Sequence, residues 1–361
     1  MQRSKKTAFS GRIPPPFPLS ADDAAPTAWE RFVQVAAGAV VRVRAAIRLT
    51  AIVTWAPSSV GFEALLLRVP GTIRIRWPRI IWSVLCKLIR VRLNVVGRRV
   101  GTVGGPAARR RGERPVIYVS NHSSWLDVVV LGAVLPCVFV AKGDIEKWPV
   151  MGWVCHVGRT IFVSRQRNTT GRERDTMISR LAGGDNVTLF PEGTSSDGSR
   201  VLPFMSAFFA IAKAPRLSAK RKAALQDTGE EESTLSFPPG MEPIIQPISV
   251  AYDRLDGMPV SRSSRPVFAW YGDMELGPHL WQLLNWSSMR ATILLHPPLD
   301  PADFPSRKAL AQAAWKAIAD GAARIRQNDI PEIPDYPVQG ENGAWQADST
   351  SSLDNTGPSF A

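Results

Sequence analysis

Two residue types suited to acid–base chemistry lie close together in the stretch S-N-H-S-S-W-L-D at 120–127. His122 and Asp127 stand five positions apart, and histidine is scarce, with 4 in 361 residues. A carboxylate that accepts a hydrogen bond from one imidazole nitrogen leaves the other nitrogen to act as a general base. No nucleophile accompanies the pair, so a substrate would have to supply the hydroxyl that loses its proton. A packed core histidine is the alternative for this stretch alone.

A second polar stretch, F-P-E-G-T-S-S-D-G at 190–198, directly follows a predicted strand. Pro191 and Gly193 favour a tight turn, which can present backbone N–H groups and the Glu192 carboxylate at one sheet edge. A polar β-turn without chemistry would have the same composition. The stretch therefore indicates a functional site only if it lies next to His122 in the fold.

Alternating strands and helices must bring the two stretches together. Apolar runs predict strands at 115–120, 137–142, 159–165, 186–190, 244–252, 267–273 and 291–296, and helices at 125–134, 170–182 and 306–326. The alternation indicates an α/β fold with a mixed, largely parallel sheet flanked by helices. His122 follows the first strand, at the sheet edge where ligands gather in such folds. Asp127 falls in the first turn of the next helix, from which its carboxylate can reach back to the imidazole.

Positive charge is concentrated in the first third of the chain. Residues 1–118 carry 21 Lys and Arg against 5 Asp and Glu, and the remainder carries 23 against 26, which gives the net +13. Between residues 29 and 96 arginines interrupt long apolar stretches, a pattern typical of helices that lie among lipid headgroups. No nucleic-acid-binding module accompanies the charge, so anionic membrane lipids are the expected partner and nucleic acid is not. A helix pair packed on a soluble core is the alternative.

The apolar run at 49–67 is just long enough to span a bilayer. Pro57 and Glu63 within it favour a re-entrant or interfacial segment, or at most a weak span. The neighbouring Lys and Arg residues favour the cytoplasmic face of the inner membrane.

Missing motifs exclude several classes of protein. The three cysteines, Cys86, Cys137 and Cys155, have no C-x-x-C spacing, which argues against a disulfide framework or a zinc site, and no metal site is predicted. Neither the G-x-S-x-G of serine hydrolases nor the G-x-G-x-x-G of dinucleotide enzymes is present.

Four stretches, in order, resemble the motifs of the glycerolipid acyltransferases, the 1-acylglycerol-3-phosphate acyltransferase family. N-H-S-S-W-L-D resembles the first motif and F-P-E-G-T the third. Residues 141–165 resemble the second, with an early lysine and a final I-F-V-S-R, and I-I-Q-P-I-S-V at 244–250 resembles the apolar fourth. Four motifs in the right order are far more specific than any one of them, although residues 1–100 and 253–361 are not covered.

The resemblance implies transfer of a fatty acyl group from an acyl-carrier-protein (acyl-ACP) or coenzyme A (acyl-CoA) thioester to a lysolipid hydroxyl. It implies that His122 removes the hydroxyl proton, that Asp127 holds the imidazole, and that neither a metal nor a cofactor beyond the thioester co-substrate is needed. The substrate-binding positions that it carries over are Asn121, Lys142, Arg165, Glu192, Gly193 and Thr194. Lys142 and Arg165 would lie near the headgroup, where positive charge suits a phosphate. Solvent-exposed strand ends are the plain alternative for these two.

One departure from the family pattern concerns the acceptor. The family commonly has F-P-E-G-T-R-S, whereas Ser195 stands where the arginine would be. Arginine is the preferred bidentate phosphate ligand, so a phosphate acceptor loses one expected partner. The T-S-S-D-G form also resembles lyso-ornithine lipid acyltransferases, whose acceptor has no phosphate.

Because Lys142 and Arg165 remain, 1-acylglycerol-3-phosphate (lysophosphatidic acid) ranks first as acceptor, which would give phosphatidic acid for phospholipid synthesis. Lyso-ornithine lipid ranks second. A non-catalytic, basic membrane-associated protein is the alternative of another class.

The expected organisation has four parts. A flexible N-terminus at 1–28 precedes a membrane-associated helical module at 29–103. The acyltransferase domain occupies 104–327, with a mobile insertion at about 216–240, and a polar, disordered tail follows at 328–361.

Overall fold

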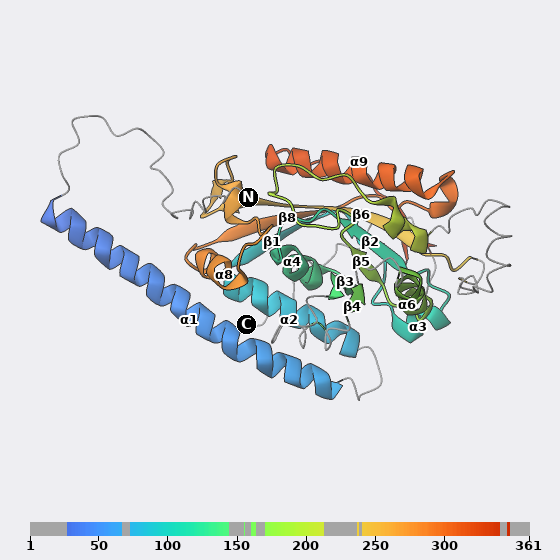
Figure 1. Ribbon diagram of the computed structural model, residues 1–361, viewed down its shortest axis with the longest axis horizontal. Coiled ribbons are helices and arrows are strands. Elements are labelled where there is room, and N and C mark those ends of the chain that lie inside the picture. Colours follow the sequence, from blue (N-terminus) through green and yellow to red (C-terminus); the bar gives the residue numbers. More distant parts are fainter. Residues whose placement is uncertain are drawn as a thin grey trace, which may run out of the picture. The chain divides into compact units, whose positions relative to one another are not determined.

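The computed structural model describes residues 27–66, 73–143, 155, 160–163, 170–212, 237, 240–339 and 345–346. It forms two compact units, one ending at Val43 and the other beginning at Arg44. Helix α1 (Ala28–Leu66) contributes to both units, and the other described elements belong to the second (Figure 1).

A mixed sheet forms the centre of the second unit. Its order is β1 (Val91–Val96), β8 (Met289–Leu295), β6 (Ile244–Leu255), β2 (Val116–Ser120), β5 (Val187–Leu189), β3 (Val138–Lys142) and β4 (Ile161–Val163). These neighbours are parallel except for β6 and β8, and the short β7 (Met258–Pro259) pairs antiparallel with β6. The predicted α/β fold with a mixed sheet is confirmed.

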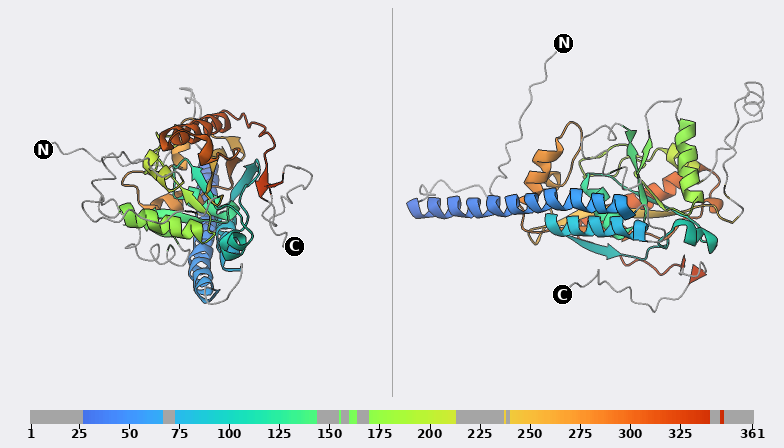
Figure 2. Two further views of the ribbon diagram at one scale, coloured as in Figure 1. Left: turned by 90° about the vertical axis from the view of Figure 1, so that its right-hand side faces the viewer. Right: turned by 90° about the horizontal axis from the view of Figure 1, so that it is seen from below.

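Helices cover both faces of this sheet (Figure 1 and Figure 2). On one face lie α2 (Ile73–Ile89), α4 (Leu126–Val134) and α8 (Leu276–Leu284), and on the other lie α6 (Thr170–Ala182) and α9 (Arg307–Arg326). Successive side chains of a strand point to opposite faces. Tyr118 of β2 accordingly packs with the α4 side, and Ile117 with the α9 side. All five residues of β2 are buried, which fits its uninterrupted apolar sequence.

Shorter elements complete the second unit. They are α3 (Gly105–Arg110), the 3₁₀ turns η3 (Ser206–Ile211), η4 (Arg265–Val267) and η5 (Pro301–Asp303), and the strand pair β9 (Val338–Gln339) and β10 (Trp345–Gln346). The strand expected at 267–273 is wrong, because the chain there is the end of η4 followed by irregular backbone.

The boundary expected at 103/104 is also wrong. Strand β1 precedes it, yet β1 pairs in parallel with β8 along its whole length. Helix α2 likewise packs its buried residues Cys86 and Ile89 into the core shared with α4. Residues 73–103 are therefore part of the α/β domain. Its edge strand β1 lies within the basic stretch that was interpreted as part of the membrane-associated module.

The tail expected to be disordered from residue 328 is anchored up to residue 339. The buried Tyr336 hydroxyl donates to the carbonyls of Arg98 and Leu295 and accepts from Gln246 Nε2 at 3.1 Å. Gln339 exchanges hydrogen bonds with the backbone of Arg114. Two side chains thus hold a segment whose polar composition predicted disorder.

The run at 49–67 forms no separate segment. Up to residue 66 it belongs to the continuous α1, which passes through Pro57. Among the described residues, no helix is both long and apolar enough to cross a membrane. The flexible segment expected at 1–28 and the insertion expected at 216–240 lie almost entirely outside the described residues.

Candidate active site

The loop that carries His122 is fastened to the sheet by its neighbour Asn121. The Asn121 amide nitrogen donates to the Val250 carbonyl and its oxygen accepts from the Val250 N–H, both at 2.9 Å. This side chain thereby ties the end of β2 to the adjacent β6. The resemblance placed Asn121 among substrate-binding residues, whereas its amide is engaged with protein backbone and fixes the start of the loop.

His122 and Asp127 are in contact, as their spacing predicted. Imidazole Nδ1 lies 3.0 Å from Asp127 Oδ2, and the same oxygen accepts from the backbone N–H groups of Ser123 at 2.7 Å and Ser124 at 2.9 Å. Asp127 is fully buried in the first turn of α4, where a carboxylate is favoured by the helix dipole. Nδ1 therefore carries the hydrogen, and Nε2 presents a lone pair.

Tyr252 of β6 completes the support of Asp127, and sequence reasoning missed it. Its hydroxyl donates to Asp127 Oδ1 at 2.7 Å, and its ring stacks on Phe268. Burial, followed by the Asp127 charge, raises the pKa of Tyr252 well above its ordinary value, so the hydroxyl remains a donor. No local signal marks Tyr252, because it lies 125 residues from Asp127 in the chain.

Glu192 connects the two polar stretches. Its Oε1 accepts from the His122 N–H at 2.7 Å and its Oε2 from the Leu202 N–H at 2.9 Å. Burial raises the pKa of Glu192 to about 7, although both backbone donors favour the ionised form. Of the two roles expected for Glu192, contact with acceptor hydroxyls and bracing of the site, the described contacts are those of a brace.

The turn after Glu192 holds His122 from another side. Ser196 N–H donates to the His122 carbonyl at 2.9 Å. Gly193 has a φ of 68°, a left-handed conformation that glycine adopts at low cost. Thr194 is exposed at the tip of this turn. The 190–198 stretch therefore meets His122 at the sheet edge.

Comparison with known proteins identifies the family. A family model described as "Acyltransferase" matches residues 100–227. A lyso-ornithine lipid O-acyltransferase of Brucella abortus is 33% identical over 271 residues, covering 75% of this chain and 90% of that protein. The chain belongs to the glycerolipid acyltransferase family.

Two further proteins are similar to this acyltransferase, one in part of its sequence and one in its fold. A 1-acyl-sn-glycerol-3-phosphate acyltransferase of Neisseria gonorrhoeae is 33% identical over 140 residues, which cover 37% of this chain and 55% of that protein. The crystal structure of the 1-acyl-sn-glycerophosphate acyltransferase PlsC from Thermotoga maritima matches with a TM-score of 0.50 at 16% identity, over 80% of this chain and 95% of that one. The second match concerns the fold alone.

The other described histidines of the acyltransferase belong to the core. His279 accepts from Trp125 Nε1 at 2.9 Å and donates to the Val267 carbonyl, and burial lowers its pKa. His296 bonds the Ser249 hydroxyl at 2.8 Å, and burial lowers its pKa to about 4. The His122 side chain is 20% exposed, with its ring stacked on Phe190. Of these three, His122 alone combines exposure with a carboxylate partner.

The second motif of the acyltransferase is described only in part. Lys142 ends β3, beside Val163 of β4, and Arg165 lies outside the described residues. The headgroup role expected for these two residues stays a prediction. Among the described residues, no three His, Cys, Asp or Glu side chains gather in a way that could hold a metal ion.

Proposed function

We propose that this acyltransferase moves a fatty acyl group to the hydroxyl of lyso-ornithine lipid. The observation that carries the proposal is the extent of the likeness to the lyso-ornithine lipid O-acyltransferase, which covers 75% of the chain, against 37% for the 1-acyl-sn-glycerol-3-phosphate enzyme. Ser195, in place of the arginine common in the family, supports it. Lysophosphatidic acid, which the sequence ranked first, becomes the second candidate, with Lys142 and Arg165 in its favour.

The described geometry suits general-base catalysis of this transfer. As the lysolipid oxygen attacks the thioester carbonyl carbon, its proton passes to His122 Nε2, and the imidazolium formed is stabilised by Asp127. The new C–O bond replaces the C–S bond, and the proton leaves with the departing thiol. Neither an acyl-enzyme nor a metal enters this scheme, and the donor is acyl-ACP or acyl-CoA.

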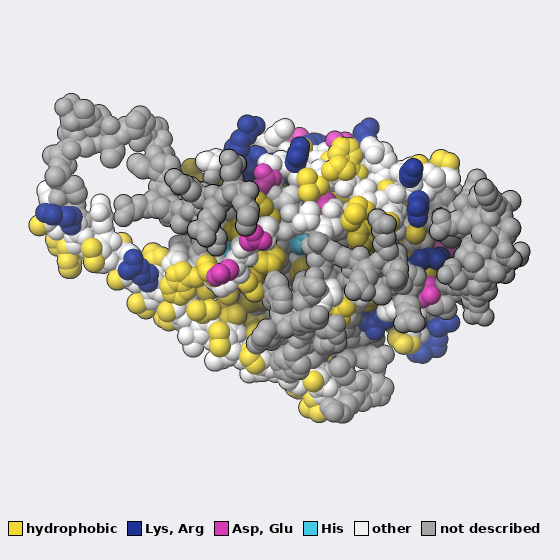
Figure 3. Space-filling model, viewed as in Figure 1, with side chains coloured by type: hydrophobic (Ala, Val, Ile, Leu, Met, Phe, Trp, Pro, Cys, Tyr) yellow, Lys and Arg dark blue, Asp and Glu magenta, His cyan; other side chains and the backbone are white. Residues whose placement is uncertain are grey.

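We also propose that the enzyme works at the membrane surface, on the cytoplasmic face of the inner membrane. Arg44 and Arg48 donate to the carbonyls of Leu284, Asn285 and Trp286 at the end of α8, so these charges face protein. Apolar side chains of the same helix remain outside, among them Ile47 at 65% and Val53 at 61% exposure. Figure 3 shows hydrophobic side chains gathered along α1. Such an apolar surface suits a lipid interface.

The acceptor assay tests the function. Purified protein in detergent receives an acyl donor and, in separate reactions, lyso-ornithine lipid, lysophosphatidic acid or no acceptor, and thiol release and acylated product are measured. The proposal expects rapid, acceptor-dependent turnover with lyso-ornithine lipid. Turnover with lysophosphatidic acid alone would favour the second candidate, and thiol release without acceptor would indicate a thioesterase.

A further inference from the structure

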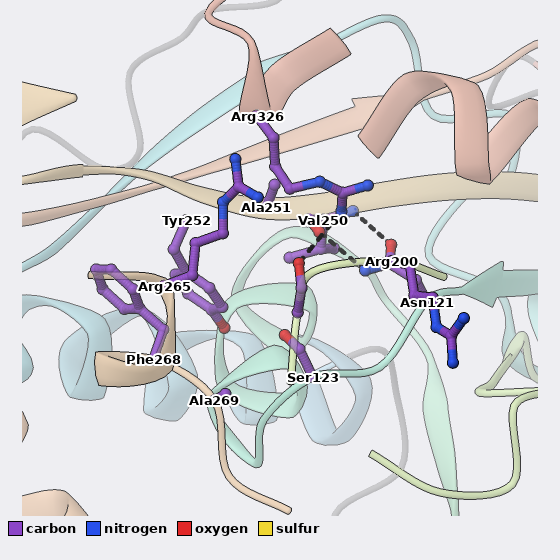
Figure 4. Close-up of a pocket in the computed structure, with 11 residues that line it drawn as sticks. Asn121, Ser123, Arg200, Val250, Ala251, Tyr252, Arg265, Phe268, Ala269 and Arg326 are labelled. Carbon is purple, nitrogen blue, oxygen red and sulfur yellow. Dashed lines mark hydrogen bonds between the residues drawn. The ribbon is translucent and has the colours of Figure 1, made fainter. Parts of the chain in front are cut away.

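A pocket beside the active-site loop contains two arginines that the proposed chemistry does not use. Asn121 and Ser123, which flank His122 in the chain, both line it, together with Gly198 of the following turn. Arg265 of η4 and Arg326, the last residue of α9, enter the pocket from the opposite side (Figure 4). The pocket is thus continuous with both stretches that build the catalytic site.

The hydrogen-bonding capacity of these two guanidinium groups is largely unused. Arg326 Nη1 makes one long bond of 3.4 Å to the Gly198 carbonyl. Arg265 Nε is buried and has no hydrogen-bond partner among the described residues. Within the same part of the chain, no carboxylate forms an ion pair with either arginine. A buried donor without a partner, such as Arg265 Nε, is costly, so the arrangement favours a ligand that accepts from it.

The two like charges act on each other. Burial, followed by the Arg265 charge, lowers the pKa of Arg326, while Asp197 and Glu192 oppose the shift. Both acids are engaged elsewhere: Glu192 accepts from backbone N–H groups of His122 and Leu202, and Asp197 accepts from Ser199. The arginine pair therefore lacks a bound counter-charge among the described residues. A planar oxyanion would bridge both guanidinium groups with charge-assisted hydrogen bonds.

We propose that Arg265 and Arg326 together bind the oxyanion of the acceptor headgroup. For the identity of that anion, the ornithine carboxylate, the inference rests on the proposed function; a phosphate of lysophosphatidic acid offers the same chemistry. An anion held here lies beside the loop that presents His122, so the pair would orient the acceptor hydroxyl toward the base. Neither arginine falls in a family motif.

Steady-state kinetics with two acceptors and three variants test this inference. The acceptors are lyso-ornithine lipid and its carboxyl methyl ester, and the variants are Arg265→Gln, Arg326→Gln and Arg262→Gln. Each of the first two should raise KM for the free acid about tenfold to hundredfold, the effect of losing a charge-assisted hydrogen bond. KM for the methyl ester and for the acyl donor should stay within about twofold.

The control is Arg262→Gln, which should match wild type. Arg262 is an exposed arginine three residues before Arg265, and it is not one of the residues that line the pocket. Arg326→Lys, which keeps the charge but loses the planar fork, should fall between Arg326→Gln and wild type. Thermal unfolding of each variant confirms that the fold is kept.

Three results would overturn the inference that Arg265 and Arg326 bind the headgroup oxyanion. Unchanged KM for the acid in both Gln variants, an equal rise for acid and ester, or a rise confined to the acyl donor would each overturn the inference. Failure of wild type to acylate lyso-ornithine lipid would instead refute the proposed function. Lysophosphatidic acid then replaces it as the acceptor, and a rise in its KM in both Gln variants would still support an oxyanion site here.

Discussion

Replacing Asp127 with asparagine separates charge from shape at the catalytic pair. In the structure Asp127 Oδ2 accepts from His122 Nδ1 and from two backbone N–H groups, and Oδ1 accepts from the Tyr252 hydroxyl. An asparagine whose oxygen takes the Oδ2 position keeps the first three bonds. Its NH₂ group then faces the Tyr252 oxygen, which can rotate its hydrogen and accept. The fold and the position of the imidazole should therefore survive the change.

The loss in Asp127→Asn is the negative charge opposite the imidazolium that forms during transfer. Charge-assisted hydrogen bonds are worth about 1.5–3 kcal/mol, so kcat should fall roughly 10-fold to 150-fold. The assay is acceptor-dependent thiol release from the acyl donor, with thermal unfolding as the check on folding. Because Asp127 acts through His122, the double variant Asp127→Asn/His122→Ala should be no slower than His122→Ala alone.

Tyr252→Phe is the matched control, because it removes one bond to the same carboxylate and leaves the charge and the imidazole contact in place. We expect a smaller loss of kcat than in Asp127→Asn, together with some loss of stability from the unpaired Oδ1. An Asp127→Asn enzyme within twofold of the wild-type rate would refute the reasoning and leave Asp127 as a cap of α4.

Three further predictions concern the turn after β5. The pKa of Glu192 is raised to about 7 from an ordinary 4.5, so the folded state holds the proton more tightly than the unfolded state does. Protonated Glu192 therefore stabilises the fold by ~3 kcal/mol below pH 4.5, and this contribution is lost as pH rises through 7. Denaturant unfolding should show a lower free energy of unfolding at pH 8 than at pH 5 in wild type, and this difference should be absent in Glu192→Gln. Gly193→Ala should cost about 1–2 kcal/mol of stability and lower activity, because φ is 68° there and an added Cβ would lie 2.2 Å from Met205 Cε. The control Gly257→Ala, with φ of 83° and open space around it, should be destabilised with normal kinetics. Ser195→Arg should lower KM for lysophosphatidic acid and raise KM for lyso-ornithine lipid. The opposite pattern would contradict the acceptor assignment.

Local sequence patterns were sufficient for the centre of the site. His122 lies in the short loop after an apolar strand, and Asp127 lies in the first turn of the next helix. Both elements are clear in the sequence, so the contact between the two side chains follows from their spacing. The Glu192 turn could be placed at the same edge because parallel strands end together. These features depend on neighbours in the chain or on the general form of an α/β sheet.

Long-range features were not accessible in the same way. Tyr252 reaches Asp127 only because β6 pairs with β2 in one register, and Arg326 enters the pocket only because α9 packs on the sheet. Strand β1 was missed because its polar residues Arg92 and Asn94 alternate with apolar residues inside a stretch interpreted as helical and lipid-bound. The anchoring of Tyr336 depends on Arg98 and Gln246, which are remote in sequence. Side chains whose partners are set by tertiary packing carry no local signal.

A competition experiment tests the central claim most directly. Lyso-ornithine lipid and lysophosphatidic acid are mixed in equal amounts in one detergent preparation with limiting acyl donor, and the two products are quantified by mass spectrometry. The product ratio then reports the ratio of kcat/KM for the two acceptors in a single reaction. We expect ornithine lipid to predominate with the wild-type enzyme and both products to be lost with His122→Ala. Predominance of phosphatidic acid, or normal product formation by His122→Ala, would contradict the account.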